Sequence, residues 1–94
     1  MGLKMVKKDN MTIIGATRGF GRWIAEHLNN DFKITITSPN KDRGLEVAKE
    51  LNVKYIQDNI EAVQNADIII FSVPITIMVE TIKEVAPHAP EGSL

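Results

Sequence analysis

A chain of 94 residues, 44% of them hydrophobic and 24% charged, has the composition of one ordinary globular domain. Its formal net charge of -1 gives no general attraction to nucleic acid or to anionic membranes, so neither is expected as a partner. The lack of cysteine excludes disulfides, and no apolar run approaches the roughly 18 residues of a membrane span, which together favour a cytoplasmic protein.

The first half of the chain alternates strand-like and helix-like patterns. Residues 1–9 are polar and basic without a period, which predicts a loose leader before a domain at 10–94. A β-rich apolar run predicts a buried strand over 11–14, and apolar spacing predicts a helix over 19–30. The residues expected on the packing face of that helix are Phe20, Trp23, Ile24, His27 and Leu28.

A second strand is predicted over 32–37, followed by a capping turn at 38–40. The next helix has an apolar face of Leu45, Ala48 and Leu51. The remaining elements are a strand over 53–56, a short helix from Asp58 to Asn65, and a strand over 67–72. A last helix follows Pro74 and stops at Pro87 and Pro90, with an expected buried stripe of Ile75, Met78, Val79, Ile82, Val85 and Ala86.

The predicted order is therefore βαβαβαβα, which indicates an α/β fold with a Rossmann-type open parallel sheet. A complete dinucleotide-binding domain contains more strands than this chain supplies. We therefore expect an incomplete single domain, without the substrate domain that would accompany it.

A glycine-rich loop joins the first predicted strand to the first helix. It consists of Gly15, Ala16, Thr17, Arg18, Gly19, Phe20 and Gly21. In an open α/β sheet this position carries a nucleotide's phosphates, because glycines allow close approach and the helix N-terminus offers free N–H groups. The spacing G-x-x-x-G-x-G departs from G-x-G-x-x-G, with Ala16 and Arg18 in glycine positions. The alternative interpretation is a glycine-rich turn that binds nothing.

The end of the second strand predicts which dinucleotide binds. An enzyme that uses NAD usually places an acidic residue there for the ribose 2′-hydroxyl. Here Ser38 is neutral, and Lys41, Arg43 and Arg18 supply nearby positive charge, which suits a 2′-phosphate. We therefore favour NADP, with NAD possible if Asp42 binds the 2′-hydroxyl. The two cations of the helix could alternatively form a solvated first turn.

The segment that leaves the fourth strand is Ser72, Val73 and Pro74, which reaches the sheet edge where ligands bind. Pro74 donates no N–H and redirects the chain, so it either shapes the cofactor pocket or simply starts a helix.

Nearly the whole chain beyond residue 10 resembles the prephenate dehydrogenase family, which includes arogenate dehydrogenases. It resembles the archaeal members most closely. The segments that carry the resemblance are IIGATRGFGRWIAEHL (13–28), RGLEVAKEL (43–51), DNIEAVQNADIIIFSVPI (58–75) and IKEVAPHAPEGSL (82–94). The resemblance implies oxidative decarboxylation of prephenate or arogenate in tyrosine synthesis with NAD or NADP. It also implies a homodimer formed through a helical domain outside this chain.

Carried over by motif, the resemblance implies that residues 15–21 form the phosphate loop and that Ser38 occupies the ribose-selecting position. It also implies that residues 72–74 lie beside the adenosine and nicotinamide riboses. The family's catalytic histidine lies beyond the fifth strand, so no catalytic residue is expected here and we expect the chain alone to be inactive. His27 is expected to be partly buried on a packing face, and His88 to be a surface residue. No metal-ligand cluster is present in the sequence pattern.

Three alternatives stay open at this point. Short-chain reductases and epimerases share the glycine spacing, but they need a Tyr-x-x-x-Lys pair, and Asn59 stands four residues after Tyr55. Deazaflavin-dependent or β-hydroxyacid reductases share the nucleotide half. A non-catalytic NAD(P)-binding module would share it too.

Overall fold

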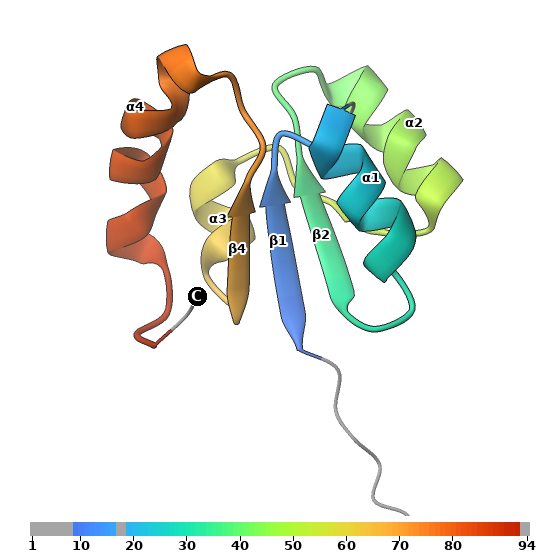
Figure 1. Cartoon of the computed structure of the whole chain (residues 1–94), viewed down its shortest axis with the longest axis horizontal. Coiled ribbons are helices and arrows are strands. Elements are labelled where there is room, and N and C mark those ends of the chain that lie inside the picture. Colours follow the sequence, from blue (N-terminus) through green and yellow to red (C-terminus); the bar gives the residue numbers. More distant parts are fainter. Residues whose placement is uncertain (1–8, 17–18, 93–94) are drawn as a thin grey trace, which may run out of the picture.

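The computed structural model describes residues 9–16 and 19–92 (Figure 1). The strands are β1 (Asn10–Ile14), β2 (Lys33–Thr37), β3 (Lys54–Tyr55) and β4 (Ile68–Phe71). The helices are α1 (Gly19–Leu28), α2 (Lys41–Leu51), α3 (Asn59–Val63) and α4 (Ile75–Val85), followed by a 3-10 turn, Ala86–His88. No helix in these described ranges is long and apolar enough to cross a membrane.

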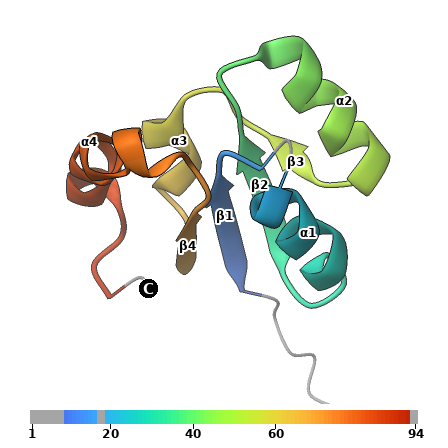
Figure 2. The ribbon, with the colours of Figure 1, turned by 45° about the horizontal axis from the view of Figure 1, so that its top comes forward.

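The four strands form one parallel sheet in the order β3-β2-β1-β4. β1 lies in the middle, with Ile13 aligned to Ile36 of β2 on one side and to Ile70 of β4 on the other. Each parallel connection contains a helix, as such crossovers require (Figure 2). This architecture confirms the predicted Rossmann-type βαβαβαβα order.

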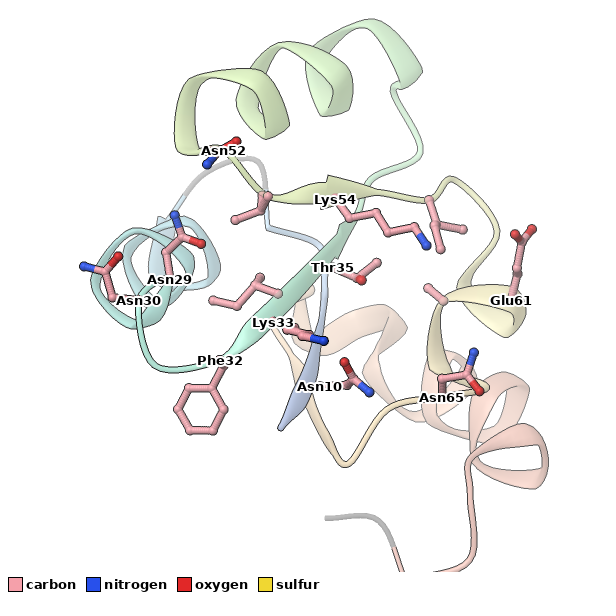
Figure 3. Close-up of a pocket in the computed structure, with 14 residues that line it drawn as sticks. Asn10, Asn29, Asn30, Phe32, Lys33, Thr35, Asn52, Lys54, Glu61 and Asn65 are labelled. Carbon is pink, nitrogen blue, oxygen red and sulfur yellow. The ribbon is translucent and has the colours of Figure 1, made fainter. Parts of the chain in front are cut away.

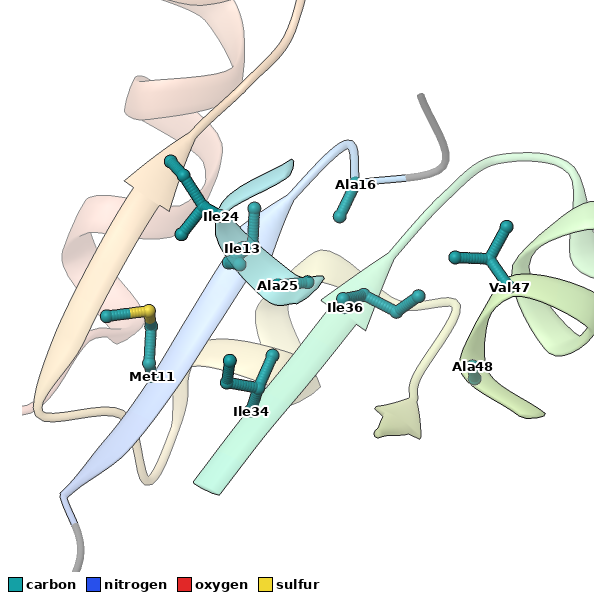
Figure 4. Close-up of a cluster of buried hydrophobic side chains, with 9 residues drawn as sticks. All are labelled: Met11, Ile13, Ala16, Ile24, Ala25, Ile34, Ile36, Val47 and Ala48. Carbon is teal, nitrogen blue, oxygen red and sulfur yellow. The ribbon is translucent and has the colours of Figure 1, made fainter. Parts of the chain in front are cut away.

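The face of the sheet covered by α1 and α2 holds the larger core (Figure 4). Its side chains come from alternate strand positions, as the two-residue period of a strand requires. The buried members are Met11, Ile13, Ala16, Ile24, Ala25, Ile34, Ile36, Val47 and Ala48. These residues fix the first two strands beneath the first two helices.

The opposite face carries α3 and α4 and a smaller core of Ile14, Val63 and Val85. A buried hydrogen bond ties α3 to the sheet, because the hydroxyl of Thr12 donates to the carbonyl of Ala62 at 2.7 Å. The two cores together position the carboxyl ends of β1, β2 and β4 at one edge.

The predicted helix starts are confirmed by their caps. The Asn40 side chain accepts the Arg43 N–H at 3.0 Å, and the Asp58 side chain accepts the Ile60 N–H at 2.9 Å. Pro74 occupies the N-cap of α4, one residue before its first turn. The elements are one to two residues shorter at several ends than predicted, as with α1, which ends at Leu28 rather than at residue 30.

The predicted packing face of α1 is wrong in its aromatic members. Phe20 is 67% exposed and Trp23 is 53% exposed, and His27 is also exposed instead of partly buried. The helix packs on the sheet through Gly21, Ile24 and Ala25, and the small size of Gly21 and Ala25 allows close approach. The aromatic rings lie outside and stack on one another, with centroids 5.7 Å apart for Phe20–Trp23 and 4.3 Å for Trp23–His27.

The predicted buried stripe of α4 is also wrong except at Val85. Val85 is buried, whereas Ile75, Val79 and Ile82 are exposed, Met78 is half-buried and Ala86 is exposed. α4 lies at the β4 edge of the sheet beside α3, so only its last turn reaches the core (Figure 1). On α2 the predicted face is confirmed at Ala48 and wrong at Leu45, which is exposed because that helix packs through Gly44, Val47 and Ala48.

Candidate nucleotide-binding site

The candidate site lies where β1, β2 and β4 end, at the edge of the sheet next to the start of α1 (Figure 1). Parallel strands release their chains at the same edge, and loops there are free to contact a ligand. The structure therefore brings Gly15, Ser38 and Ser72 to one edge, as the sequence predicts. Thr17 and Arg18 lie outside the described residues.

Gly15 is required by its backbone conformation and by its neighbours. Its φ of +86° lies in the left-handed region, and a Cβ added there would lie 2.5 Å from the Ser72 carbonyl oxygen. The Gly15 N–H donates to the Thr37 carbonyl at 3.1 Å and lies 3.2 Å from the Thr37 hydroxyl. The end of β1 is thus held between β2 and β4, with no room for a side chain.

Ser72 closes the start of α1 from the β4 side. Its hydroxyl oxygen accepts the N–H of Gly21 at 2.9 Å, and a Cβ on Gly21 would lie 2.8 Å from that oxygen. One of the N–H groups that a helix start leaves without an intrahelical acceptor is thereby satisfied by the protein itself. The hydroxyl of Ser72 therefore contacts the glycine-rich loop, a contact that the sequence did not predict.

Gly19 differs from the other loop glycines because its surroundings are open. Its φ is +68°, yet a Cβ built on it meets no atom of the described residues within 4 Å. It begins α1, so its N–H and that of Phe20 belong to the first turn, which has no intrahelical acceptors. An anion placed here would meet the backbone N–H groups of the first helical turn and the positive end of the helix dipole.

Ala16 contributes to the core rather than to the open side of the loop. It is fully buried, and its methyl group lies among the side chains under α1 and α2 (Figure 4). Its N–H donates to the Thr37 carbonyl at 3.2 Å. A larger residue would disturb this packing, so Ala16 shapes the loop through its small size.

The turn after β2 is held from several sides. Ser38 is 4% exposed, and its hydroxyl accepts the Asn40 N–H at 3.2 Å. The Tyr55 hydroxyl donates to the Ser38 carbonyl at 2.7 Å, and the Gln57 amide lies 3.4 Å from the Pro39 carbonyl. Burial raises the pKa of Tyr55 above its ordinary value of 10.0, which favours the protonated hydroxyl that donates this bond.

Sequence reasoning missed Tyr55, which it considered only as part of an absent Tyr-x-x-x-Lys pair. The available signal was an aromatic residue with a polar tip in the third predicted strand, next to the turn that follows the second strand.

The first turn of α2 presents the charged groups of the candidate site. Lys41, Asp42 and Arg43 are exposed, and Arg43 pairs with Glu46 one turn further along the helix. Lys41 has no acidic partner among the described residues. An exposed pair of this kind contributes little stability and is easily exchanged for a stronger anionic partner.

The segment after β4 divides between core and surface. Val73 is half-buried against the smaller core, and its Cγ1 would lie 2.9 Å from a Cβ on Gly15. Pro74 is exposed at the N-cap of α4 and has no N–H to donate. Val73 therefore supports the loop from behind.

The described residues hold no group of three or more His, Asp or Glu placed for a metal ion. His27 and His88 are both exposed and remote from the carboxyl edge in their elements, at the end of α1 and in the turn after α4. The surface position predicted for His88 is confirmed. Neither histidine joins the candidate site.

A wide, open pocket of about 1020 Å³ lies elsewhere (Figure 3). It surrounds the amino ends of β2 and β3 and one side of α3, and Lys33, Lys54 and Thr35 extend into it. The candidate site lies at the opposite, carboxyl edge of the same sheet. Ligands of open α/β sheets bind at the carboxyl ends, so we assign the site by topology and not by pocket size.

Comparison with known proteins identifies the family. The family described as "Prephenate dehydrogenase, nucleotide-binding domain" matches residues 24–94. A protein of Methanocaldococcus jannaschii named "Probable arogenate/prephenate dehydrogenase" is 45% identical over 92 residues, which cover 95% of this chain. Those residues are 21% of that protein, so the chain spans about a fifth of its length.

Solved structures show the same fold. The arogenate dehydrogenase of Synechocystis superposes with a TM-score of 0.80 at 19% identity, over 90% of this chain and 31% of its own. The prephenate dehydrogenase of A. aeolicus, in complex with hydroxyphenyl propionate and NAD+, gives a TM-score of 0.79 at 19% identity, over 96% and 33%. The chain belongs to the prephenate dehydrogenase family and forms part of its nucleotide-binding domain.

Proposed function

We propose that the carboxyl edge of this sheet binds NADP, with NAD as the weaker ligand, in a dehydrogenase that oxidatively decarboxylates prephenate or arogenate. The observation that carries this proposal is the open space at Gly19, where a glycine with positive φ begins α1 and no protein atom of the described residues fills the side-chain position. The family membership supplies the chemistry. The M. jannaschii relative and the A. aeolicus structure carry names with these substrates or with NAD+.

The residues fit a dinucleotide in a simple division of roles. The N–H groups of Gly19 and Phe20 bind the pyrophosphate at the α1 N-terminus, while Gly15 and Gly21 let β4 close against the loop. Thr17 and Arg18, between these glycines in the sequence, belong to the proposed phosphate loop. Ala16 keeps the loop close to the core by its small size.

The ribose end is assigned to the turn after β2. Ser38 adjoins the adenosine ribose, and Lys41 and Arg43 hold the 2′-phosphate, for which Arg43 exchanges its exposed pairing with Glu46. Ser72, Val73 and Pro74 border the ribose from the β4 side. The cofactor supplies the hydride chemistry when bound, and this chain's residues bind and orient it.

The substrate-binding and catalytic groups are proposed to lie in the remainder of a longer protein, because the chain spans about a fifth of its curated relative. We further propose that this protein is cytoplasmic and dimerises through that remainder. The chain itself then binds the dinucleotide without turning over substrate. Membership of the prephenate dehydrogenase family disfavours the short-chain, deazaflavin-dependent, β-hydroxyacid and non-catalytic alternatives.

Titration calorimetry of the full-length protein with NADP+ and NAD+ tests this assignment. Gly19→Ala places a methyl group where the pyrophosphate is proposed to lie, and we expect binding of both dinucleotides to fall by more than about tenfold, equivalent to one lost charge-assisted hydrogen bond. Gly92→Ala is the matched control, because Gly92 also has a positive φ, +84°, and a Cβ built on it meets no atom of the described residues within 4 Å. Equal affinities in the two variants would refute the site.

Cofactor preference needs a second measurement. Replacing Lys41 and Arg43 together by alanine removes both proposed 2′-phosphate ligands and leaves the pyrophosphate contacts intact. We expect NADP+ to lose about 1.5–3 kcal/mol of binding free energy, the range for hydrogen bonds to charged groups, while NAD+ binding stays unchanged. Parallel loss of both dinucleotides would show that the two residues do not discriminate.

A further inference from the structure

The turn over residues 38–40 is held by two donors from one direction. Tyr55 at the end of β3 donates its hydroxyl to the Ser38 carbonyl at 2.7 Å, and Gln57, two residues further, offers its amide to the Pro39 carbonyl at 3.4 Å. Both acceptors are backbone atoms, so the contacts fix the path of the chain independently of the side chains in the turn. The strand pairing of Tyr55 with Ile36 places this donor beside the end of β2.

The same tyrosine contacts the helix that follows the turn. A Cβ added at Gly44 would overlap the Tyr55 ring, so the ring lies directly against the backbone of α2 one turn after its start. Gly44 is buried there, although its neighbours Arg43 and Leu45 are exposed. One side chain thus contacts both the turn and the first turns of α2.

The charged residues of that helix start depend on this arrangement. Lys41 and Arg43 precede Gly44 by three residues and one residue, on a helix whose N-cap is Asn40. Two flexible cationic side chains select a phosphate only if their backbone positions are fixed relative to the ribose, because ordering them at binding costs affinity. A rigid contact beneath the turn removes part of that cost.

We propose that Tyr55, assisted by Gln57, is a positioning residue that sets the choice between a 2′-phosphate and a 2′-hydroxyl through the turn 38–40 and the start of α2. The inference rests on the proposed function, since it presupposes that a dinucleotide ribose lies at this turn. In this proposal Tyr55 does not contact the ligand itself and acts only through the turn and the helix start.

The test is the ratio of NADP+ to NAD+ affinity in the full-length protein, measured by titration calorimetry. Tyr55→Phe keeps the ring against Gly44 and removes the donor to the Ser38 carbonyl. We expect the ratio of NADP+ to NAD+ affinity to fall by about three- to tenfold, which corresponds to one net hydrogen bond. Gln57→Ala should lower the same ratio by less.

A matched control exists at the other end of α2. The Asn29 side chain donates to the Leu51 carbonyl at 2.6 Å, so Asn29→Ala also removes a side-chain donor to a carbonyl at an end of the same helix. It is expected to lower stability without changing the affinity ratio. A change in ratio with Tyr55→Phe but not with Asn29→Ala would support the positioning role.

The failures are distinguishable. A wild-type protein that binds neither dinucleotide would overturn the proposed function and the inference with it. Normal wild-type binding with an unchanged ratio in Tyr55→Phe, or with equal loss of both dinucleotides, would overturn the inference alone. If Tyr55→Phe does not fold, Gln57→Ala decides, because its side chain is exposed and its loss leaves the core intact; an unchanged ratio in that variant overturns the inference.

Discussion

The two faces of the sheet are covered to different degrees. Beneath α1 and α2, nine buried side chains form a continuous core, whereas beneath α3 and α4 the buried cluster has three. Apolar side chains are present on both sides of the sheet, since the exposed residues of α4 include Ile75, Val79 and Ile82. α4 has fewer surfaces to pack against, because β4 is an edge strand and no strand of the described residues lies beyond it. A hydrophobic helix face is buried only where a second surface meets it.

The largest expected effect comes from a substitution in the larger core, under α1 and α2. Ile36 of β2 is fully buried, and Ile36→Ala leaves a cavity under α1 and α2 that should cost about 3 kcal/mol of unfolding free energy. Val79→Ala on α4 is the control, because Val79 is 61% exposed and alanine has the higher helix propensity. Its cost should stay within about 0.5 kcal/mol. Urea unfolding of the 94-residue chain and its two variants measures both; similar costs would mean that the faces are equally packed.

The same pair sharpens the comparison in the full-length protein. If further polypeptide covers the β4 edge and α4, Val79→Ala should become more costly there, while Ile36→Ala should keep the same cost. An exposed sheet edge readily accepts another strand, which gives this expectation its physical reason. A Val79→Ala cost that is small in both lengths would leave the face of α4 free in the whole protein.

A second prediction compares two hydrogen bonds on the less buried face of the sheet, one beneath α3 and one on α4. Thr12→Val replaces the buried hydroxyl that donates to the Ala62 carbonyl and leaves that acceptor unsatisfied, so it should cost about 1–2 kcal/mol. Thr81→Val on α4 removes a similar bond, 2.8 Å to the Ile77 carbonyl, but at an exposed position. Its cost should be close to zero, because water and the helix itself satisfy that carbonyl. Thermal unfolding of both variants measures the contrast, which would fail if the two melting temperatures fell alike.

The alternation of strands and helices could be predicted from the sequence because each strand and helix carries its own local period. The caps at Asn40 and Asp58 were likewise readable, since a cap bonds within three residues. The faces of α1 and α4 could not be assigned in the same way. Periodicity identifies an apolar stripe, but burial depends on what lies opposite. Small residues such as Gly21 and Ala25 can pack closest to the sheet.

In the candidate site, too, some features follow from local sequence patterns and others depend on the finished fold. The glycine loop and the turn at Ser38 were placed correctly at one sheet edge, because their positions follow from strand order. The bond from Gly21 to Ser72 joins residues 51 positions apart, and the bond from Tyr55 to Ser38 joins residues 17 apart. Such contacts depend on the register and spacing of the finished sheet, which local patterns do not encode.

The smallest expected effect concerns the pH dependence of the α1/α2 side through Tyr55. Burial raises the pKa of this tyrosine above 10.0 in the folded protein, whereas the unfolded chain titrates at the ordinary value. Below pH 10 the hydroxyl is protonated in both states and the bond to the Ser38 carbonyl is fully available. As pH rises through the folded pKa, the unfolded state loses its proton first, so the unfolding free energy of the wild type declines.

Tyr55→Phe has no such group and should lack this part of the decline. Lysine titration affects both proteins, so their difference isolates the tyrosine. Urea unfolding of wild type and Tyr55→Phe between pH 8 and about pH 11 measures it, the upper limit lying above the tyrosine's ordinary range. A constant difference across that range would show that the hydroxyl is not held in the buried, donating state on which the positioning role depends.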